Sequence, residues 1–326
     1  MILESIITWL GFFSIKEASM IFFCINFLST FLILIGSLKI ISLSSEIKHT
    51  YFIILATFIL ISRFIIQVWD QGQVSLIMLA FILGGLYFLE KDHCILSSLL
   101  LAVSINIKYM SLLFLPFFIL TRRYREVMWI VLLAVALNFL PALYVGASKN
   151  IQYLLNWIPW ITHTSLDRGS LFDFKNQSLF SMILRYACKD SPYKINILNL
   201  DFFVSLILGA SLSILIYLCI FIKSLEFINW AQILICMALF NPNSWMSNFV
   251  FLSLGYSIGI AYLVKIKFKD KITFALLVLS FILCSWGSES IVGQHLEDLW
   301  EIYSTSTWGA LILFFTLFRV KLNKSY

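Results

Sequence analysis

Charged residues are scarce in this sequence. Only 12% of its 326 residues are charged and 61% are hydrophobic, whereas soluble globular domains carry about 25% charged residues. The mean hydropathy of +0.94 agrees with this imbalance. The composition therefore excludes a soluble domain and predicts an integral protein of the lipid bilayer. The net charge of +6 does not indicate nucleic-acid binding, because most basic residues lie in short connections between apolar runs, where Lys and Arg set membrane topology.

The sequence also lacks the usual motifs of catalysis on soluble substrates. It has no glycine-rich nucleotide-binding motif and no set of Ser, His and Asp that indicates a nucleophile. Its four His residues are too few and too scattered for a metal site, and its six Cys residues show no spacing typical of a disulfide framework. We therefore expect no metal and no cofactor, and the sequence does not favour a soluble nucleotide substrate.

The sequence consists of long apolar runs and does not show the alternating segments of about 10 residues that are typical of a β-barrel. The predicted fold is therefore all-α. We expect a polytopic transmembrane helical bundle of about 10–11 spans, with residues 1–326 forming a single membrane domain. The runs cover residues 18–38, 50–69, 73–89, 94–106, 109–121, 126–146, 201–222, 225–240, 246–264, 271–287 and 305–319.

The fourth and fifth runs are separated only by Asn106-Ile107-Lys108. If the chain folds back at this point, Arg122, Arg123 and Arg125 join most other connection cations on the inner face, as the positive-inside rule requires. A single crossing would place these arginines on the face whose connections have few cations. We therefore predict a fold-back at residues 106–108, a cytoplasmic C-terminus and a periplasmic long loop at 147–200.

The same orientation places Met1 outside, because the run at 18–38 then crosses from outside to inside. Residues 1–17 are expected to lie at the outer interface, since the apolar segment before the first span is too short to cross the bilayer. We also expect one further span and an outer loop to precede this sequence.

The long loop at 147–200 contains most of the polar candidates. Ile151, Leu154, Leu155 and Ile158 repeat at helical spacing, which predicts a helix lying in the outer interface or a simple packing helix. Asn176-Gln177-Ser178 opens a second amphipathic stretch, and helix N-termini attract anions. Arg168 and Arg185 are either ordinary solvated charges or ligands for an anion near this helix.

The other polar tips share the outer face with this loop, and we expect them to surround one cavity. They are residues 69–73, the tip at 106–108, the turn at 241–245 and residues 287–304. Arg63, Gln67 and Asp70 lie on one stripe of a helix, so Arg63 either extends outward to pair with Asp70 or forms a buried pair that lines the cavity. Lys108 is either a helix-end cation at the membrane surface or a point charge for a phosphate.

Several short motifs, in this order, give the chain a family likeness. They are Gly72-Gln73-Val74, the run Leu100 to Tyr109 with Asn106 and Lys108, Arg122-Arg123, Asn176-Gln177-Ser178-Leu179 with Arg185, Asn241-Pro242-Asn243-Ser244-Trp245, and Val292-Gly293. From about residue 3 to 319 the chain resembles glycosyltransferase family 87. The resemblance implies a GT-C type membrane enzyme that moves a sugar, typically mannose or arabinose, from a polyprenyl-phosphate carrier to a glycolipid or polysaccharide at the outer face. It further implies an inverting displacement with a carboxylate base and no general need for a metal.

The sequence departs from the family pattern at two places. The family carries an N-terminal outer loop with the acidic residue proposed as base, and we expect this loop to precede residue 1 of this sequence. After the Ser-Trp of the outer turn the family often has His, where this chain has Met246-Ser247-Asn248.

We therefore expect an enzyme of the bacterial inner membrane that acts on its periplasmic face. Lys108, Arg168 and Arg185 are the candidates for donor-phosphate binding. Asp70 is the candidate base, followed by Asp173 and Glu289. The candidates for positioning the sugar or the acceptor are Gln73, Asn176, Gln177, Asn243 and Trp245. Two alternatives stay open: a non-catalytic remnant or subunit that binds lipid-linked sugar, and a lipid-sugar flippase or transporter.

Overall fold

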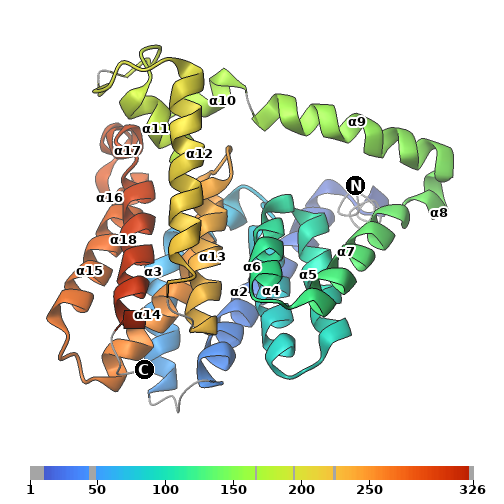
Figure 1. The fold of residues 1–326 in the computed structure, drawn as a ribbon, viewed down its shortest axis with the longest axis horizontal. Coiled ribbons are helices and arrows are strands. Elements are labelled where there is room, and N and C mark those ends of the chain that lie inside the picture. The colour runs from blue at the N-terminus through green and yellow to red at the C-terminus, as the bar shows by residue number, and fades with distance from the viewer. Residues whose placement is uncertain (1–10, 44–48, 166, 194, 223–224, 323–326) are drawn as a thin grey trace. The chain divides into compact units, whose positions relative to one another are not determined.

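The computed structural model describes residues 11–43, 49–165, 167–193, 195–222 and 225–322. All regular elements among these residues are helices (Figure 1), which confirms the predicted all-α class. Continuous helices satisfy every backbone N–H and C=O internally, as the apolar runs require in lipid. The first ten residues of the predicted interfacial segment lie outside the described residues, and helix α2 already begins at Ile15 behind a capping box formed by Ser14 and Glu17.

Five helical segments of the described chain are long and apolar enough to cross a membrane. They are α2 (Ile15–Ser42), α3 (Thr50–Asp70), α7 with α8 (Tyr124–Val145), α12 (Phe202–Cys219) and η3 with α14 (Met246–Lys265). Shorter apolar helices follow the remaining predicted runs, so the structure confirms a polytopic helical bundle. These are α4 (Ser75–Glu90), α5 (Cys94–Ile107), η2 with α6 (Tyr109–Leu120), α13 (Glu226–Phe240) and α15 with η4 (Lys271–Trp286). The last predicted run corresponds to α18 (Thr305–Leu322), which has 18 residues.

The chain forms two compact units. Unit 1 comprises residues 1–43 and 68–163, and unit 2 comprises residues 44–67 and 164–326. In unit 1, α4 packs between α2 and α5, and α5 packs against α7. Close contact between α4 and α5 is possible because Gly85 has no side chain: a Cβ at this position would lie 2.9 Å from Leu101 Cγ.

The chain doubles back within unit 1 as predicted. Lys108 interrupts the helical path with an extended backbone (φ −146°, ψ 132°) between α5 and η2. Arg123 Nη2, at the start of α7, lies 3.6 Å from Glu90 Oε1, at the end of α4. Because α5 carries the chain away from Glu90, η2 and α6 must return it to the same end of the unit.

Helix α9 (Ala147–Ser165) confirms the helix predicted in the first part of the long loop. Ile151, Leu155 and Trp157 are exposed on it, whereas the side chain of Ile158 lies outside the described part. Exposed apolar side chains on an amphipathic helix are typical of a segment that lies in a membrane interface.

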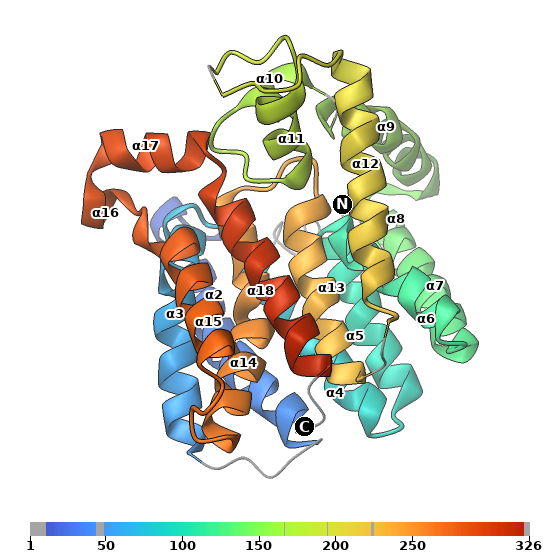
Figure 2. The same ribbon diagram turned by 60° about the vertical axis from the view of Figure 1, so that its left-hand side comes forward.

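Unit 2 is built around α13 and the η3–α14 segment, which are almost entirely buried. Helix α18 runs between α13 and α15 (Figure 2). The remaining helices of the long loop are α10 (Arg168–Phe172) and α11 (Leu179–Ala187), and α11 packs against α12. The segment before α18 forms α16 (Glu289–Val292) and α17 (Gln294–Ile302).

Candidate functional site

Lys108 and Gln73 come together in unit 1, as the hypothesis of a shared polar site requires. The Lys108 ammonium donates to Ser75 Oγ at 3.0 Å and to Gln73 Oε1 at 3.5 Å. Ser75 is fully buried at the start of α4. Burial lowers the pKa of Lys108 to about 8, because a desolvated ammonium loses hydration that neutral oxygens only partly replace. The result is a cation held at a fixed position at the tip of the fold-back.

Asp70 ends α3 at a tight turn that leads to Gln73. Gly72 has a φ of +58°, a left-handed conformation that favours glycine. The backbone N–H of Gln73 donates to Val68 O at 3.0 Å, and Trp69 packs with its ring centroid 5.6 Å from that of Phe23. Asp70 is exposed at this turn.

Arg63 is buried in unit 2, and its partners differ from the predicted one. Its Nη2 lies 2.8 Å from Glu297 Oε1 and 3.7 Å from Glu301 Oε1, and its Nη1 donates to Cys284 O at 3.0 Å. The expected pairing with Asp70 is therefore replaced by a pairing with α17. Glu297 and Glu301 are one helical turn apart, so a single guanidinium faces two carboxylates.

Glu301 shows the consequence of this unequal charge balance. Burial raises the pKa of its carboxyl to about 7, and nearby Glu297 acts in the same direction while Arg63 opposes both. Glu297 and Glu301 were not among the residues predicted from the sequence. Their four-residue spacing inside a polar tip was a signal that they share one helix face.

Arg185 organises the second half of the long loop. Its guanidinium is fully buried and donates to Ser304 Oγ at 2.7 and 3.1 Å, to Asn176 O at 3.0 Å, to Asp173 O at 2.9 Å and to Ser181 Oγ at 2.9 Å. The planar fork of an arginine suits such a set of acceptors. Because these donors are occupied by protein oxygens, the structure does not present Arg185 to a substrate phosphate.

Asn176 connects the long loop to the turn at 241–245. Its Nδ2 donates to Ser170 O at 2.9 Å and to Pro242 O at 2.7 Å, and its Oδ1 accepts from the N–H groups of Ser178 and Ser244. Ser178 in turn caps α11 through its side chain, which confirms the predicted helix start. A buried amide with all these contacts positions the loop and is closed to a sugar.

Gln177 has a similar structural role on the other side of the loop. Its Nε2 donates to Phe174 O at 2.7 Å and to Glu301 O at 2.8 Å. Its backbone N–H donates to Ser244 O at 2.8 Å, and its carbonyl accepts from Thr307 Oγ1 at 2.8 Å. The loop, the 241–245 turn, the end of α17 and the start of α18 are thereby joined into one hydrogen-bonded assembly.

A family comparison gives this geometry its context. The model of glycosyltransferase family 87 matches residues 5–247, which is more than half of the chain. The chain belongs to glycosyltransferase family 87. It is therefore a membrane glycosyltransferase. No curated protein and no solved structure matches it.

The matched region of this family 87 glycosyltransferase contains the Lys108 cluster, α11 and the 241–245 turn, whereas α17 with Glu297 and Glu301 lies beyond it. Among the described residues, no group of His, Cys, Asp and Glu could hold a metal ion. The predicted site residues divide between the two units. Asp70, Gln73 and Lys108 belong to unit 1, and the others belong to unit 2.

Three predicted binding residues of unit 2 of the glycosyltransferase remain open to a ligand, and the candidate base Glu289 is exposed at the start of α16. Arg168 is exposed, with its guanidinium 4.3 Å from the Phe202 ring centroid and 3.7 Å from the carboxylate of Asp190. Trp245 is 40% exposed. Asn243 is half-buried, and its Nδ2 donates to Thr164 O at 3.1 Å.

Proposed function

We propose that this family 87 enzyme transfers a mannose-type sugar from a polyprenyl-phosphate carrier to a glycolipid or polysaccharide acceptor, at the periplasmic face of the bacterial inner membrane. The observation that carries the proposal is the placement of Lys108. A lysine held against Ser75 and Gln73 at the end of a helical hairpin offers a fixed positive charge to a phosphate that anchors in the bilayer. The C-terminus is then cytoplasmic, and no metal or cofactor takes part.

The reaction needs one base and one stabilised leaving group. The Asp70 carboxylate accepts the proton of an acceptor hydroxyl, whose oxygen attacks the anomeric carbon of the donor sugar. The bond from this carbon to the carrier phosphate breaks, and the phosphate leaves with the electron pair. Lys108 stabilises the negative charge that develops on the leaving oxygen, and such stabilisation is often the largest catalytic contribution.

The remaining candidates have different parts in this proposal. Gln73 orients the Lys108 ammonium. Trp245 and Asn243 contact sugar or acceptor, since aromatic rings and amides are typical of such contacts. Arg168 is the exposed cation of the long loop and attracts an anionic lipid. Arg185, Asn176 and Gln177 act as positioning residues that hold the loop against the 241–245 turn.

The test is sugar transfer by the purified full chain in vesicles that contain a polyprenyl-phosphate-linked mannose. We expect Lys108→Ala to lower kcat about 100-fold, the lower end of the effect of removing one charge-stabilising group, and Lys108→Arg to recover part of it. Lys16→Ala, which removes an exposed lysine of the same unit, is the matched control.

The Asp70→Asn variant distinguishes a role of Asp70 as the catalytic base from a role in binding the donor. We expect it to abolish transfer while the donor still binds, because the amide cannot accept the proton. Unchanged turnover in Lys108→Ala would refute the phosphate role. Donor binding without any transfer by the unmodified chain would favour a lipid-sugar-binding subunit instead.

A further inference from the structure

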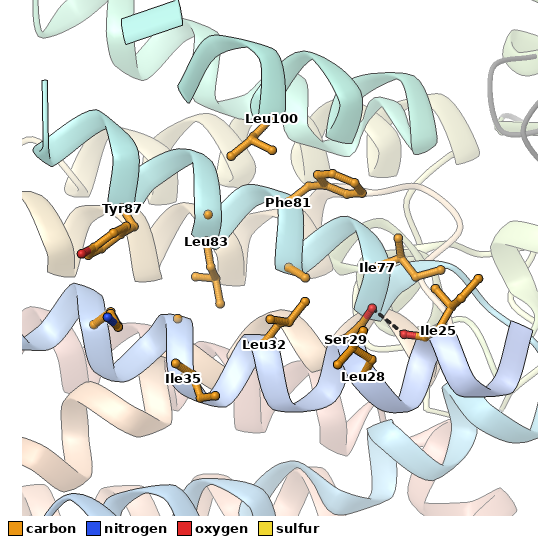
Figure 3. A pocket seen from close by; sticks show the side chains of 14 residues that line it. Ile25, Leu28, Ser29, Leu32, Ile35, Ile77, Phe81, Leu83, Tyr87 and Leu100 are labelled. Carbon is orange, nitrogen blue, oxygen red and sulfur yellow. Dashed lines mark hydrogen bonds between the residues drawn. The ribbon is translucent and has the colours of Figure 1, made fainter. Parts of the chain in front are cut away.

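A groove of about 520 Å³ runs along unit 1 between α2 and α4. Figure 3 shows Leu28, Leu32 and Ile35 of α2 facing Ile77, Phe81 and Leu83 of α4, with Leu100 of α5 above them. Its size is within the range of about 300–1,000 Å³ that is typical of ligand pockets. Leu28, Leu32 and Ile35 are about half exposed, so the groove presents an almost purely apolar surface.

Small residues line this groove. They are Ala80 and Gly84 of α4 and Gly36 of α2; a Cβ at Gly36 would lie 3.3 Å from Leu83 Cβ, so the two helices approach closely at this point. The lining runs from Ile25 to Lys39 along α2, which is about 21 Å at 1.5 Å per residue. One leaflet of a bilayer has a hydrocarbon depth of about 15 Å, so the groove can take an entire acyl chain.

One end of the groove is cationic. The ammonium groups of Lys39 and Lys91 lie 5.7 and 5.9 Å from the ring centroid of Tyr87. Lys39 lines the groove, and Lys91 lies beside the same ring, so both cations add positive charge near this end that an anion would compensate. The neighbouring carboxylate of Glu90 is engaged with Arg123. The charge at this end therefore complements a phosphate.

This end is distant from the Lys108 cluster. Ser75, which contacts Lys108, begins α4, whereas Tyr87 lies in its last turn, about 18 Å away along the helix. We propose that the groove binds an anionic phospholipid, with one acyl chain between α2 and α4 and its phosphate near Lys39 and Lys91, at the Tyr87 end. The occupant is a bilayer lipid that stabilises unit 1, separate from the sugar donor.

Photo-crosslinking tests this proposal on the full chain. The protein is reconstituted into phosphatidylcholine vesicles that contain phosphatidylglycerol with a diazirine near the end of one acyl chain. We expect labels on residues 25–32 and 77–80, at the end of the groove opposite the two lysines. Phosphatidylcholine with the same diazirine should label these residues far less.

Two sets of variants separate headgroup from acyl-chain recognition. The double variant Lys39→Gln/Lys91→Gln should reduce labelling by phosphatidylglycerol about 25-fold, since a lysine near an anionic headgroup contributes a factor of about five. The control Lys267→Gln/Lys269→Gln removes two exposed lysines of unit 2 and should leave labelling unchanged. The Ala80→Leu variant keeps Lys39 and Lys91 but fills the groove with a larger side chain. It should therefore remove labelling by the phosphatidylglycerol probe.

Three outcomes would overturn the proposal: equal labelling by the two phospholipids, full labelling in the double lysine variant, or stronger competition by a polyprenyl phosphate than by phosphatidylglycerol. The last outcome would assign the groove to the carrier of the sugar donor. Lys39 and Lys91 are exposed, so their variant should fold even if Ala80→Leu does not. Because sugar transfer is not measured here, failure of the proposed function would leave this result unaffected.

Discussion

Glu301→Gln should change how the stability of the protein depends on pH. The Glu301 carboxyl is 8% exposed and shares the Arg63 guanidinium with Glu297. Arg63 lies closer to Glu297, at 2.8 Å against 3.7 Å for Glu301, so one positive charge cannot compensate both carboxylates. Burial accordingly raises the pKa of Glu301 from 4.5 to about 7.

The direction of the effect follows from proton binding. Unfolding exposes Glu301 and returns its pKa to the ordinary value, so the unfolded state releases a proton that the folded state keeps. The contribution of Glu301 to stability is complete below about pH 4.5, falls as the pH rises, and is lost above about pH 7. At about 1.36 kcal/mol for each pH unit between these pKa values, the loss is about 3 kcal/mol.

The assay compares melting temperatures of the wild-type chain and Glu301→Gln in detergent from pH 4.5 to pH 8.5. The neutral amide resembles the protonated acid, so the two proteins should melt together at the acidic end. At the alkaline end the variant should be more stable by about 6–12 °C, at about 2–4 °C per kcal/mol. Glu289→Gln, which changes an exposed carboxylate on α16, is the control and should show no such divergence.

A constant difference between wild type and Glu301→Gln over the whole pH range would refute this reasoning. It would mean that Arg63 keeps both carboxylates ionised at every pH tested. In that case the buried cluster would be a conventional ion-pair network rather than one that takes up a proton near neutral pH.

Two further substitutions test the packing of unit 2. Arg185→Lys should destabilise the protein by about 3 kcal/mol or more, because each buried acceptor left without a donor costs about 1–3 kcal/mol. Limited proteolysis should then cut the long loop of this variant. The control Arg168→Lys, at an exposed position, should change the cleavage little. Gly309→Ala should lower the free energy of unfolding by about 1–3 kcal/mol through overpacking, since a Cβ there would overlap Cys284 Sγ and lie 2.8 Å from Ser280 O. An unchanged melting temperature would contradict the close approach of α18 to α15 and η4.

The sequence predicted the helices well because lipid leaves the backbone no other way to satisfy its polar groups. The run predicted at 94–106 is the helix Cys94–Ile107, and the run at 305–319 is Thr305–Leu322. The fold-back at Lys108 was also predictable, since the distribution of Arg and Lys reports which connections share a face. Both inferences use physical constraints that act over short stretches of chain.

Side-chain partners were much harder to predict. Arg63 and Glu297 are 234 positions apart, and Asp70 was a nearer partner on the same helix stripe. Arg185 looked like a phosphate ligand, because a sequence cannot show that Ser304 and the carbonyl oxygen of Asn176 occupy its donors. Such pairings depend on tertiary packing, which periodicity and charge counts do not encode.

The two buried arginines of unit 2 differ in how their charge is compensated. Arg63 contacts carboxylates, whereas Arg185 donates to hydroxyl and carbonyl oxygens. Burial lowers the pKa of Arg185 to about 10, so it stays protonated at neutral pH. Hydrogen bonds from a charged donor are stronger than those from a neutral one. Arg185→Met removes the charge and every donor, so it should lower the melting temperature further than Arg185→Lys, which keeps the charge and some donors. Equal melting temperatures of the two variants would show that the charge adds nothing to the anchoring of the long loop.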